Sequence, residues 1–110
     1  MLSKQNRLSL KTNRFRIERE GKTFRSPLFT YLIASREDPG LPTRLAVLVS
    51  KKNVPLSVNR HQLRRYLTEI LRHNLDQLPP GLDIILIPKK GLQTTPPDQI
   101  LSDLLHILKY

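Results

Sequence analysis

The sequence contains no cysteine, so it has no disulfide framework and no thiolate to ligate a metal or act as a nucleophile. It also lacks a long apolar run. The longest purely aliphatic stretch, Ile84–Ile87, is far shorter than the roughly 20 residues that cross a membrane. What remains is a chain of 110 residues, the size of one domain, with 38% hydrophobic residues, enough for one modest core.

Acidic residues are scarce: 9 Asp and Glu stand against 19 Lys and Arg, a net charge of +10. The acids and the three histidines are scattered, which leaves no paired carboxylates, no nucleophile with a base and no metal-ligand spacing. The excess charge lies in two blocks, residues 1–30 (8 basic, 2 acidic) and residues 51–73 (6 basic, 1 acidic). The charge distribution predicts a polyanionic partner, which is either nucleic acid or an anionic membrane surface. The scattered acids and histidines disfavour independent catalysis.

The first half of the chain predicts one helix and three strands. A helix over residues 12–20, capped by Thr12 or Asn13, ends at Gly21, although the spacing of its apolar residues also suits a strand. Residues 23–35 form two strands, broken by a proline at position 27. Residues 43–50 form the next strand, and the short turn before it predicts an antiparallel hairpin with the preceding strand.

The second half predicts helix, strand, helix. Ser57 is a suitable N-cap for a helix over residues 57–74, residues 82–87 form a strand buried on both faces, and Thr95 caps a final helix. The third strand, long helix and last strand make a βαβ unit, whose two strands run parallel. The element order predicts an α+β sandwich with a four-stranded mixed sheet.

The long helix presents a basic face. On a helical projection its cationic side chains fall within an arc of about 140°, opposite the apolar side. They are Arg60, His61, Arg64, Arg65 and Arg72, with Lys51 and Lys52 just before the helix. A solvated face is the alternative, but such a face normally mixes signs, and only Glu69 opposes these arginines. The absence of a helix-turn-helix, zinc-finger or dimerising basic pattern favours RNA phosphate over the DNA major groove.

Two adjacent motifs carry a family resemblance. Val49-Ser50-Lys51-Lys52, followed by Asn59-Arg60-His61-Gln62-Leu63-Arg64-Arg65, resembles the protein subunit of bacterial ribonuclease P. In that family a strand ends in Val-Ser-Lys-Lys and a helix follows with Arg-Asn-Arg, a hydrophobe and two basic residues. Weaker agreement extends the resemblance over about residues 6–108: Asn6-Arg7-Leu8, Gly21-Lys22, Ser26-Pro27-Leu28-Phe29 and Gly81–Ile87.

The resemblance implies one domain over residues 1–110 with an αβββαβα two-layer, ribosomal-protein-like sandwich and a left-handed βαβ crossover. It implies endonucleolytic removal of the 5′ leader of precursor tRNA. Catalysis then belongs to the RNA subunit and its bound Mg²⁺, and the protein itself binds no metal. The implied partners are the catalytic RNA and precursor tRNA, with no membrane and no small-molecule substrate. The implied location is the bacterial cytoplasm.

The resemblance also assigns residues to two surfaces. The basic helix and the two lysines before it hold the catalytic RNA, with Arg60-His61-Gln62 standing where the family has Arg-Asn-Arg. A cleft between the first helix and the sheet holds the single-stranded leader. Its expected residues are Arg14, Phe15, Phe29 and Tyr31. Arg14 stands where the family usually has Phe, and Phe15 is one residue away. Two alternatives remain open: a non-enzymatic ribosomal-type or RNA-chaperone protein on the same fold, and an autonomous nuclease, which the missing acids disfavour.

Overall fold

The structure, a computed structural model, describes residues 2, 4–38, 40–90, 92 and 95–108, with side chains up to residue 106. Within them, three α-helices and four β-strands follow in the predicted order. They are α1 (Leu10–Glu20), β1 (Lys22–Arg25), β2 (Phe29–Ser35), β3 (Arg44–Val47), α2 (Ser57–His73), β4 (Leu82–Pro88) and α3 (Pro97–Leu108). Short 3-10 turns lie at Lys4–Asn6 and Leu75–Gln77.

The strands form one mixed sheet in the order β1-β2-β4-β3. β3 and β4 pair in parallel, as the βαβ prediction required, and β1 pairs antiparallel with β2. The predicted hairpin between β2 and β3 is wrong, because β4 lies between these two strands and pairs with both. The reason lies in β4 itself: Ile84, Ile85 and Leu86 are all buried, so both faces of this strand need cover, as in a central strand.

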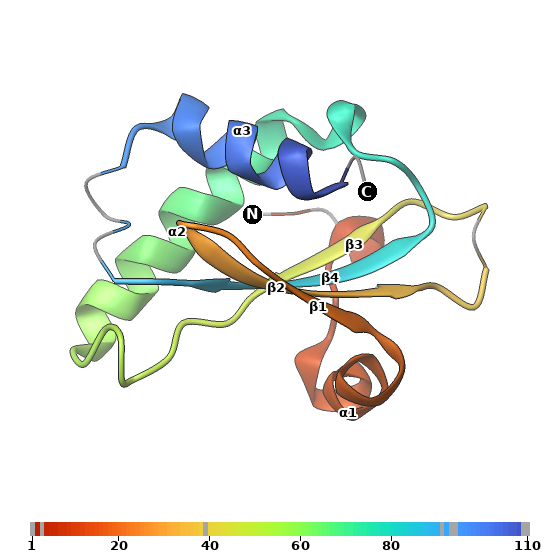
Figure 1. Cartoon of the computed structure of the whole chain (residues 1–110), viewed down its shortest axis with the longest axis horizontal. Helices are drawn as coiled ribbons and strands as arrows, with labels where there is room; N and C mark the ends of the chain where they lie inside the picture. The colour runs from red at the N-terminus through yellow and green to blue at the C-terminus, as the bar shows by residue number, and fades with distance from the viewer. Residues whose placement is uncertain (1, 3, 39, 91, 93–94, 109–110) are drawn as a thin grey trace.

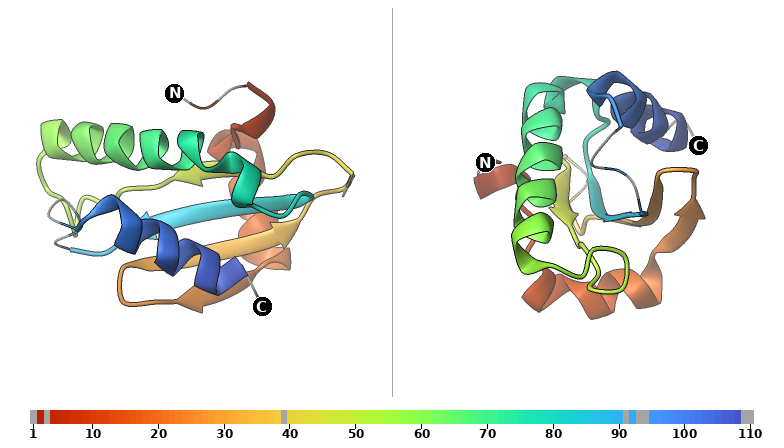
Figure 2. Two further views of the ribbon diagram at one scale, coloured as in Figure 1. Left: turned by 90° about the horizontal axis from the view of Figure 1, so that it is seen from above. Right: turned by 90° about the vertical axis from the view of Figure 1, so that its left-hand side faces the viewer.

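Helices cover both faces of the sheet. α2 and α3 lie side by side on one face, and α1 lies on the other (Figures 1 and 2). Alternation along β2 separates the two cores: Phe29 and Tyr31 pack with α2 and α3, whereas Ala34 packs with Ile17 of α1. The α+β class and the four-stranded mixed sheet are confirmed. The sheet is the middle of three layers rather than one of two, and the left-handed crossover stays a prediction.

The helix ends differ from the predicted caps. α1 begins at Leu10 after Ser9, and α2 begins at Ser57 after Leu56, with no side-chain cap at either start. Thr12, Asn13 and Ser57 are therefore helical residues, and α3 begins at Pro97, two residues after Thr95.

Gly21 ends α1 as predicted. Its N–H donates to the carbonyl of Ile17 (2.8 Å). A Cβ atom at Gly21 would lie 2.5 Å from that carbonyl oxygen and 2.8 Å from the carbonyl oxygen of Ile33, so only glycine fits where the chain passes from α1 into the sheet.

A buried carboxylate joins α1 to the sheet. Asp83 of β4 is fully buried and accepts two hydrogen bonds from Arg44 of β3, at 2.7 Å each. Arg16 of α1 donates to the same carboxylate. Burial alone would raise the pKa of Asp83, but the hydrogen bonds and charges of Arg44 and Arg16 outweigh it, so the pKa lies below its usual value. Three elements are thereby tied to one charge.

We predict that Asp83→Asn lowers the free energy of unfolding by about 3–5 kcal/mol at pH 7, because both arginines lose their buried counter-charge. Since the folded state lowers this pKa, the contribution is complete above the unfolded pKa of about 3.9 and is lost as the pH falls through the folded pKa. Urea unfolding from pH 7 to pH 2 measures it. The difference between wild type and variant should shrink on acidification. The exposed Asp76→Asn is the control, and an equal loss there would contradict the prediction.

Candidate nucleic-acid interface

α2 is amphipathic, as predicted. Its apolar side packs onto the sheet through Leu63, Leu67, Ile70 and Leu71, all buried. The opposite arc exposes three arginines and one histidine. They are His61, Arg64, Arg65 and Arg72. The sequence folds this way because the apolar residues recur at helical spacing, so burial of one stripe forces the basic arc into solvent.

Arg64 and Arg65 are the available cations of this arc. Within the described part of the chain, neither makes a hydrogen bond or an ion pair with protein, and the same holds for His61. Exposed guanidinium groups without protein partners are ready to bind phosphate oxygens in pairs. These three predicted residues are therefore placed together on one open surface.

The two lysines project from the turn before α2. The N–H of Asn53 donates to Ser50 Oγ (3.1 Å) and the N–H of Val54 donates to the Ser50 carbonyl (3.0 Å), which closes the turn. Lys51 and Lys52 form its exposed tip. The turn extends the cationic surface beyond the start of the helix.

Arg60 and Arg72 differ from the others because both have partners. Arg60 is half-buried, and its Nη1 donates to the carbonyls of Val54 (3.0 Å) and Pro55 (2.8 Å), so it fixes the lysine-bearing loop to α2. Arg72 donates to Glu69 (2.9 Å), and this guanidinium lowers the pKa of the Glu69 carboxyl to about 2. The local charge of Arg72 is therefore partly compensated. The sequence shows that Arg60 and Arg72 are cations, but the partners that they bind are visible only in the structure.

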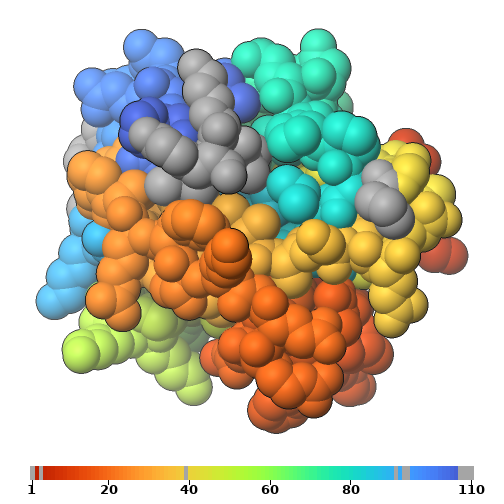
Figure 3. Space-filling view, turned by 45° about the vertical axis from the view of Figure 1, so that its right-hand side comes forward, coloured from red at the N-terminus to blue at the C-terminus, as the bar shows by residue number. Residues whose placement is uncertain are grey.

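A second surface lies on the α1 face of the sheet. There α1 covers one end, and the other end carries half-buried side chains. They are Thr30, Leu32, Leu48 and Ile87. In Figure 3 the surface is recessed between α1, in orange-red, and the loop before α2, in yellow-green. The floor of the recess is largely apolar.

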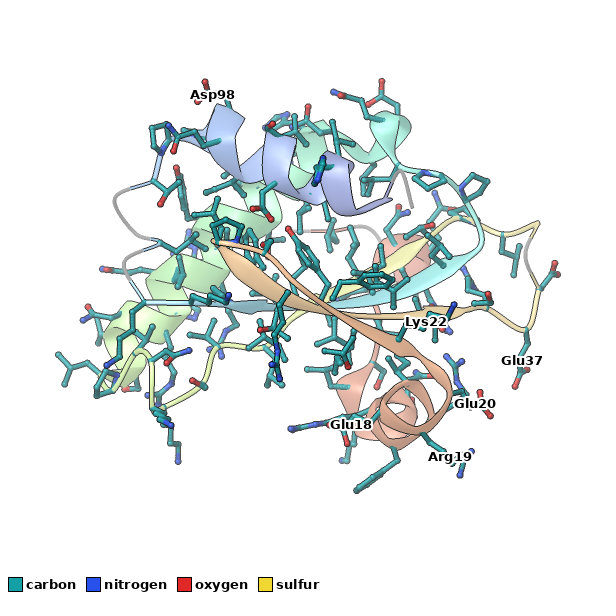
Figure 4. The ribbon with its side chains drawn as sticks, viewed as in Figure 1. Glu18, Arg19, Glu20, Lys22, Glu37 and Asp98 are labelled. Atoms are coloured by element: carbon teal, nitrogen blue, oxygen red, sulfur yellow. The ribbon has the colours of Figure 1, made fainter. Side chains whose placement is uncertain are left out.

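α1 turns different residues toward this recess than predicted. Glu18 lies on the flank of α1 that faces the loop before α2, and Glu20 lies on the opposite flank (Figure 4). Arg14 shares the Glu18 flank, since its Nε donates to Glu18 Oε1 (3.0 Å). Phe15 is 82% exposed and lies about 100° around the helix from Arg14. Arg14 is thus placed at the recess as a paired cation, whereas Phe15 lies on the outer surface of α1.

Phe29 and Tyr31 do not reach the recess, which corrects their predicted role in leader binding. Both are buried, at 1% and 0% exposed, on the opposite face of the sheet. The Tyr31 hydroxyl donates to Asp103 of α3, and burial, followed by that carboxylate, raises its pKa. Alternation showed that these aromatics share a face, but not that α3 covers it.

Several residues escaped the sequence reasoning. Leu48 and Ile87 form part of the recess floor, and Arg16, Arg44 and Asp83 set the position of α1. For Arg16, Arg44 and Asp83 the sequence contains one signal, which is the acidic Asp83 inside the otherwise apolar strand β4. A buried charge in such a strand requires a cationic partner.

The described residues contain neither a metal-binding cluster nor a membrane-spanning helix. Within residues 2–106, wherever side chains are placed, no group of three or more His, Asp or Glu residues is arranged to hold a metal ion. No described helix has both the length and the apolar character needed to span a membrane.

A basic helix on one face of a mixed α+β sheet, with a recess on the other face, is the arrangement expected of a small cationic protein with a polyanionic partner. The family model described as Ribonuclease P matches residues 2–110. The chain therefore belongs to the ribonuclease P protein family, as the sequence motifs predicted.

Individual relatives agree with this assignment. The ribonuclease P protein component of Finegoldia magna is 31% identical over 93 residues, which cover 84% of this chain and 79% of that protein. The component of Pseudomonas aeruginosa is 43% identical over 61 residues, 56% of this chain, and this match spans only 44% of that protein's length.

Solved structures share the fold. The RNase P protein from Thermotoga maritima superposes with a TM-score of 0.80 at 30% identity, over 94% of both chains. The RNase P protein of Staphylococcus aureus has a TM-score of 0.73 at 24% identity, over 96% of this chain and 94% of that one, which supports the fold alone.

The partners of Arg60 generate a stability prediction. Arg60→Ala removes two charge-assisted hydrogen bonds to loop carbonyls and should lower the free energy of unfolding by about 1.5–3 kcal/mol. Arg64→Ala removes no hydrogen bond or ion pair with a described residue and should change it by less than about 0.5 kcal/mol. Thermal unfolding of both variants measures the difference. Equal stabilities would show that Arg60 does not hold the loop.

Proposed function

We propose that this chain is the protein subunit of a ribonuclease P that removes the 5′ leader of precursor tRNA, with the catalytic centre in the RNA subunit. The observation that carries the proposal is the open cationic surface of α2 and its preceding turn. That surface joins His61, Arg64 and Arg65, whose side chains have no partner among the described residues, to the exposed lysines of the turn. Membership of the family supports the same role.

The catalytic RNA is the proposed ligand of the α2 surface. Its phosphates would bind Arg64 and Arg65 directly, together with Lys51, Lys52 and His61. Arg60 acts mainly by holding the lysine turn in place, because its guanidinium already donates to two carbonyls. Arg72 contributes less, because Glu69 already compensates its charge.

The recess on the α1 face is the proposed site of the leader. A single strand needs cations for its phosphates and apolar contacts for its bases. The recess supplies the apolar contacts, and the cation at its border, Arg14, is paired with Glu18 and must exchange that partner to bind a phosphate. Leu32, Leu48 and Ile87 supply the floor, and Arg14 stands at the border. A ribosomal-type or RNA-chaperone protein would have no need of this second surface, so its presence favours the precursor-processing role.

Metal chemistry in this proposal belongs to the RNA subunit. Mg²⁺ held by RNA would activate water and stabilise the leaving oxygen, while the chain supplies positive charge and substrate affinity. Because the protein supplies part of the positive charge that neutralises the RNA phosphates, its stimulation of cleavage should be largest at low Mg²⁺ concentration. The proposed compartment is the cytoplasm, where precursor tRNA is made in bacteria.

Cleavage of precursor tRNA by the cognate catalytic RNA tests the proposal. We expect the chain to stimulate 5′ maturation at low Mg²⁺, because its cations replace part of the ionic screening. Timed reactions with and without protein, and with protein alone, measure this by gel. A reaction that the protein does not accelerate would overturn the proposal, and cleavage by protein alone would place catalysis in the chain.

Salt dependence tests the α2 surface. Arg64→Ala and Arg65→Ala should each reduce the magnitude of the slope of log K against log salt by about 0.7–0.9, since each removes one phosphate contact. Arg19→Ala of α1 is the matched control, because that arginine is 75% exposed and lies away from α2. Titration of labelled catalytic RNA from 50 to 400 mM salt (roughly the range over which such slopes are measured) gives the values. Slopes equal to that of wild type would mean that the basic arc is only solvated.

A further inference from the structure

A small pocket opens on the flank of α2 beside the basic arc. Its volume is about 200 Å³, and four described residues of α2 line it. They are Asn59, Gln62, Leu63 and Tyr66. Pockets for larger organic ligands start at about 300 Å³, so this one suits a single planar group. Its described lining contains two amides, an aromatic ring and an aliphatic side chain, with no charge.

The amides of this pocket are unused by the protein. The other four asparagines of the chain, at positions 6, 13, 53 and 74, each donate their side-chain amide to a backbone carbonyl. Within the described residues, the side-chain amide of Asn59 makes no hydrogen bond, and neither does that of Gln62. Each amide offers a donor and an acceptor side by side at the pocket. This combination complements the edge of a nucleobase.

The apolar part of the pocket is held in place. Leu63 is 2% exposed and belongs to the core. Tyr66 is half-buried, and its hydroxyl donates to the carbonyl of Thr95 (2.9 Å), which fixes the ring at the foot of the pocket. A fixed aromatic ring is a surface on which an unpaired base can stack.

The surroundings favour RNA as the source of the ligand. Arg65 follows Gln62 by three residues and therefore lies on the neighbouring helical turn. A strand whose phosphate binds Arg65 would bring its bases to the same flank of α2.

We propose that this pocket binds one unpaired adenine of the RNA that lies on α2. An amide of Asn59 or Gln62 pairs with the adjacent donor and acceptor of the adenine edge, and the base stacks on Tyr66. Adenine follows from the amide, because Asn and Gln pair in bidentate fashion with its amino group and ring nitrogen. The inference rests on the proposed function for the RNA, but the pocket itself can be tested without it.

Side-chain amide signals in nuclear magnetic resonance test the pocket on the free protein. We expect millimolar adenosine monophosphate to shift the side-chain NH₂ signals of Asn59 and Gln62. Ribose 5-phosphate, which carries the same anion without the base, should leave them in place. Equal shifts with ribose 5-phosphate, or no shift with either probe, would overturn the proposal. Equal shifts with uridine monophosphate would overturn the choice of adenine.

Affinity for the catalytic RNA provides the second test. The double variant Asn59→Ala/Gln62→Ala should bind about 5- to 100-fold more weakly at fixed salt, the effect of losing one bidentate base contact. Its salt slope should equal that of wild type, because no phosphate contact is removed. The exposed Gln99→Ala on α3 is the matched control. An affinity equal to that of the control, or a reduced slope, would overturn the proposal.

The two proposals fail separately. If the chain does not stimulate precursor cleavage but adenosine monophosphate still shifts the two amide signals, the processing role is wrong and the base pocket stands. If cleavage is stimulated and the signals do not move, the role stands and the pocket is wrong. Thermal unfolding of the double variant confirms that it is folded.

Discussion

The arrangement of this protein depends on the ion pairs that the Asp83 carboxylate makes with two arginines. The carboxylate lies fully buried in the central strand and is bound by Arg44 from the edge strand and Arg16 from α1. Because desolvation offsets much of the attraction in a buried ion pair, its main effect here is to fix the position of α1, rather than to add net stability. It holds α1 at one end of the sheet face, which leaves the other end open. The recess exists because α1 is anchored off-centre.

The cations of α2 fall into two groups that composition cannot separate. Arg64 and Arg65 have no protein partner in the described structure, whereas Arg60 and Arg72 are already bound to loop carbonyls and to Glu69. A net charge of +10 therefore overstates the number of charges that can meet a ligand. The number of cations without a protein partner describes a positive surface better than its net charge does. A paired guanidinium must give up its protein partner before it can bind a ligand.

Much of the fold was accessible from the sequence, and the errors have physical causes. Helical spacing placed α2 and its basic face correctly, and the continuous apolar run of β4 indicated a strand buried on both faces. The hairpin between β2 and β3 was predicted from a short turn alone, which says nothing about a strand inserted later. Strand alternation puts Phe29 and Tyr31 on one face, but the packing of α2 and α3 decides that this face is core. Arg60 could be seen as a cation, but its role depends on carbonyls that no residue pattern encodes.

The position of β4 also has a consequence for the order in which the protein can fold. β4 is the last strand along the chain, yet it pairs with both β2 and β3. On the ribosome, the β1–β2 hairpin can form early. Before residues 82–88 emerge, the described pairing of β3 is limited to the bridge between Leu45 and Arg7. Contacts between distant segments close slowly, and the rows of exposed β2 and β3 backbone groups stay open meanwhile. The β2 amides that face β4 should therefore gain protection from hydrogen exchange together with those that join β3 to β4, in the step that inserts β4.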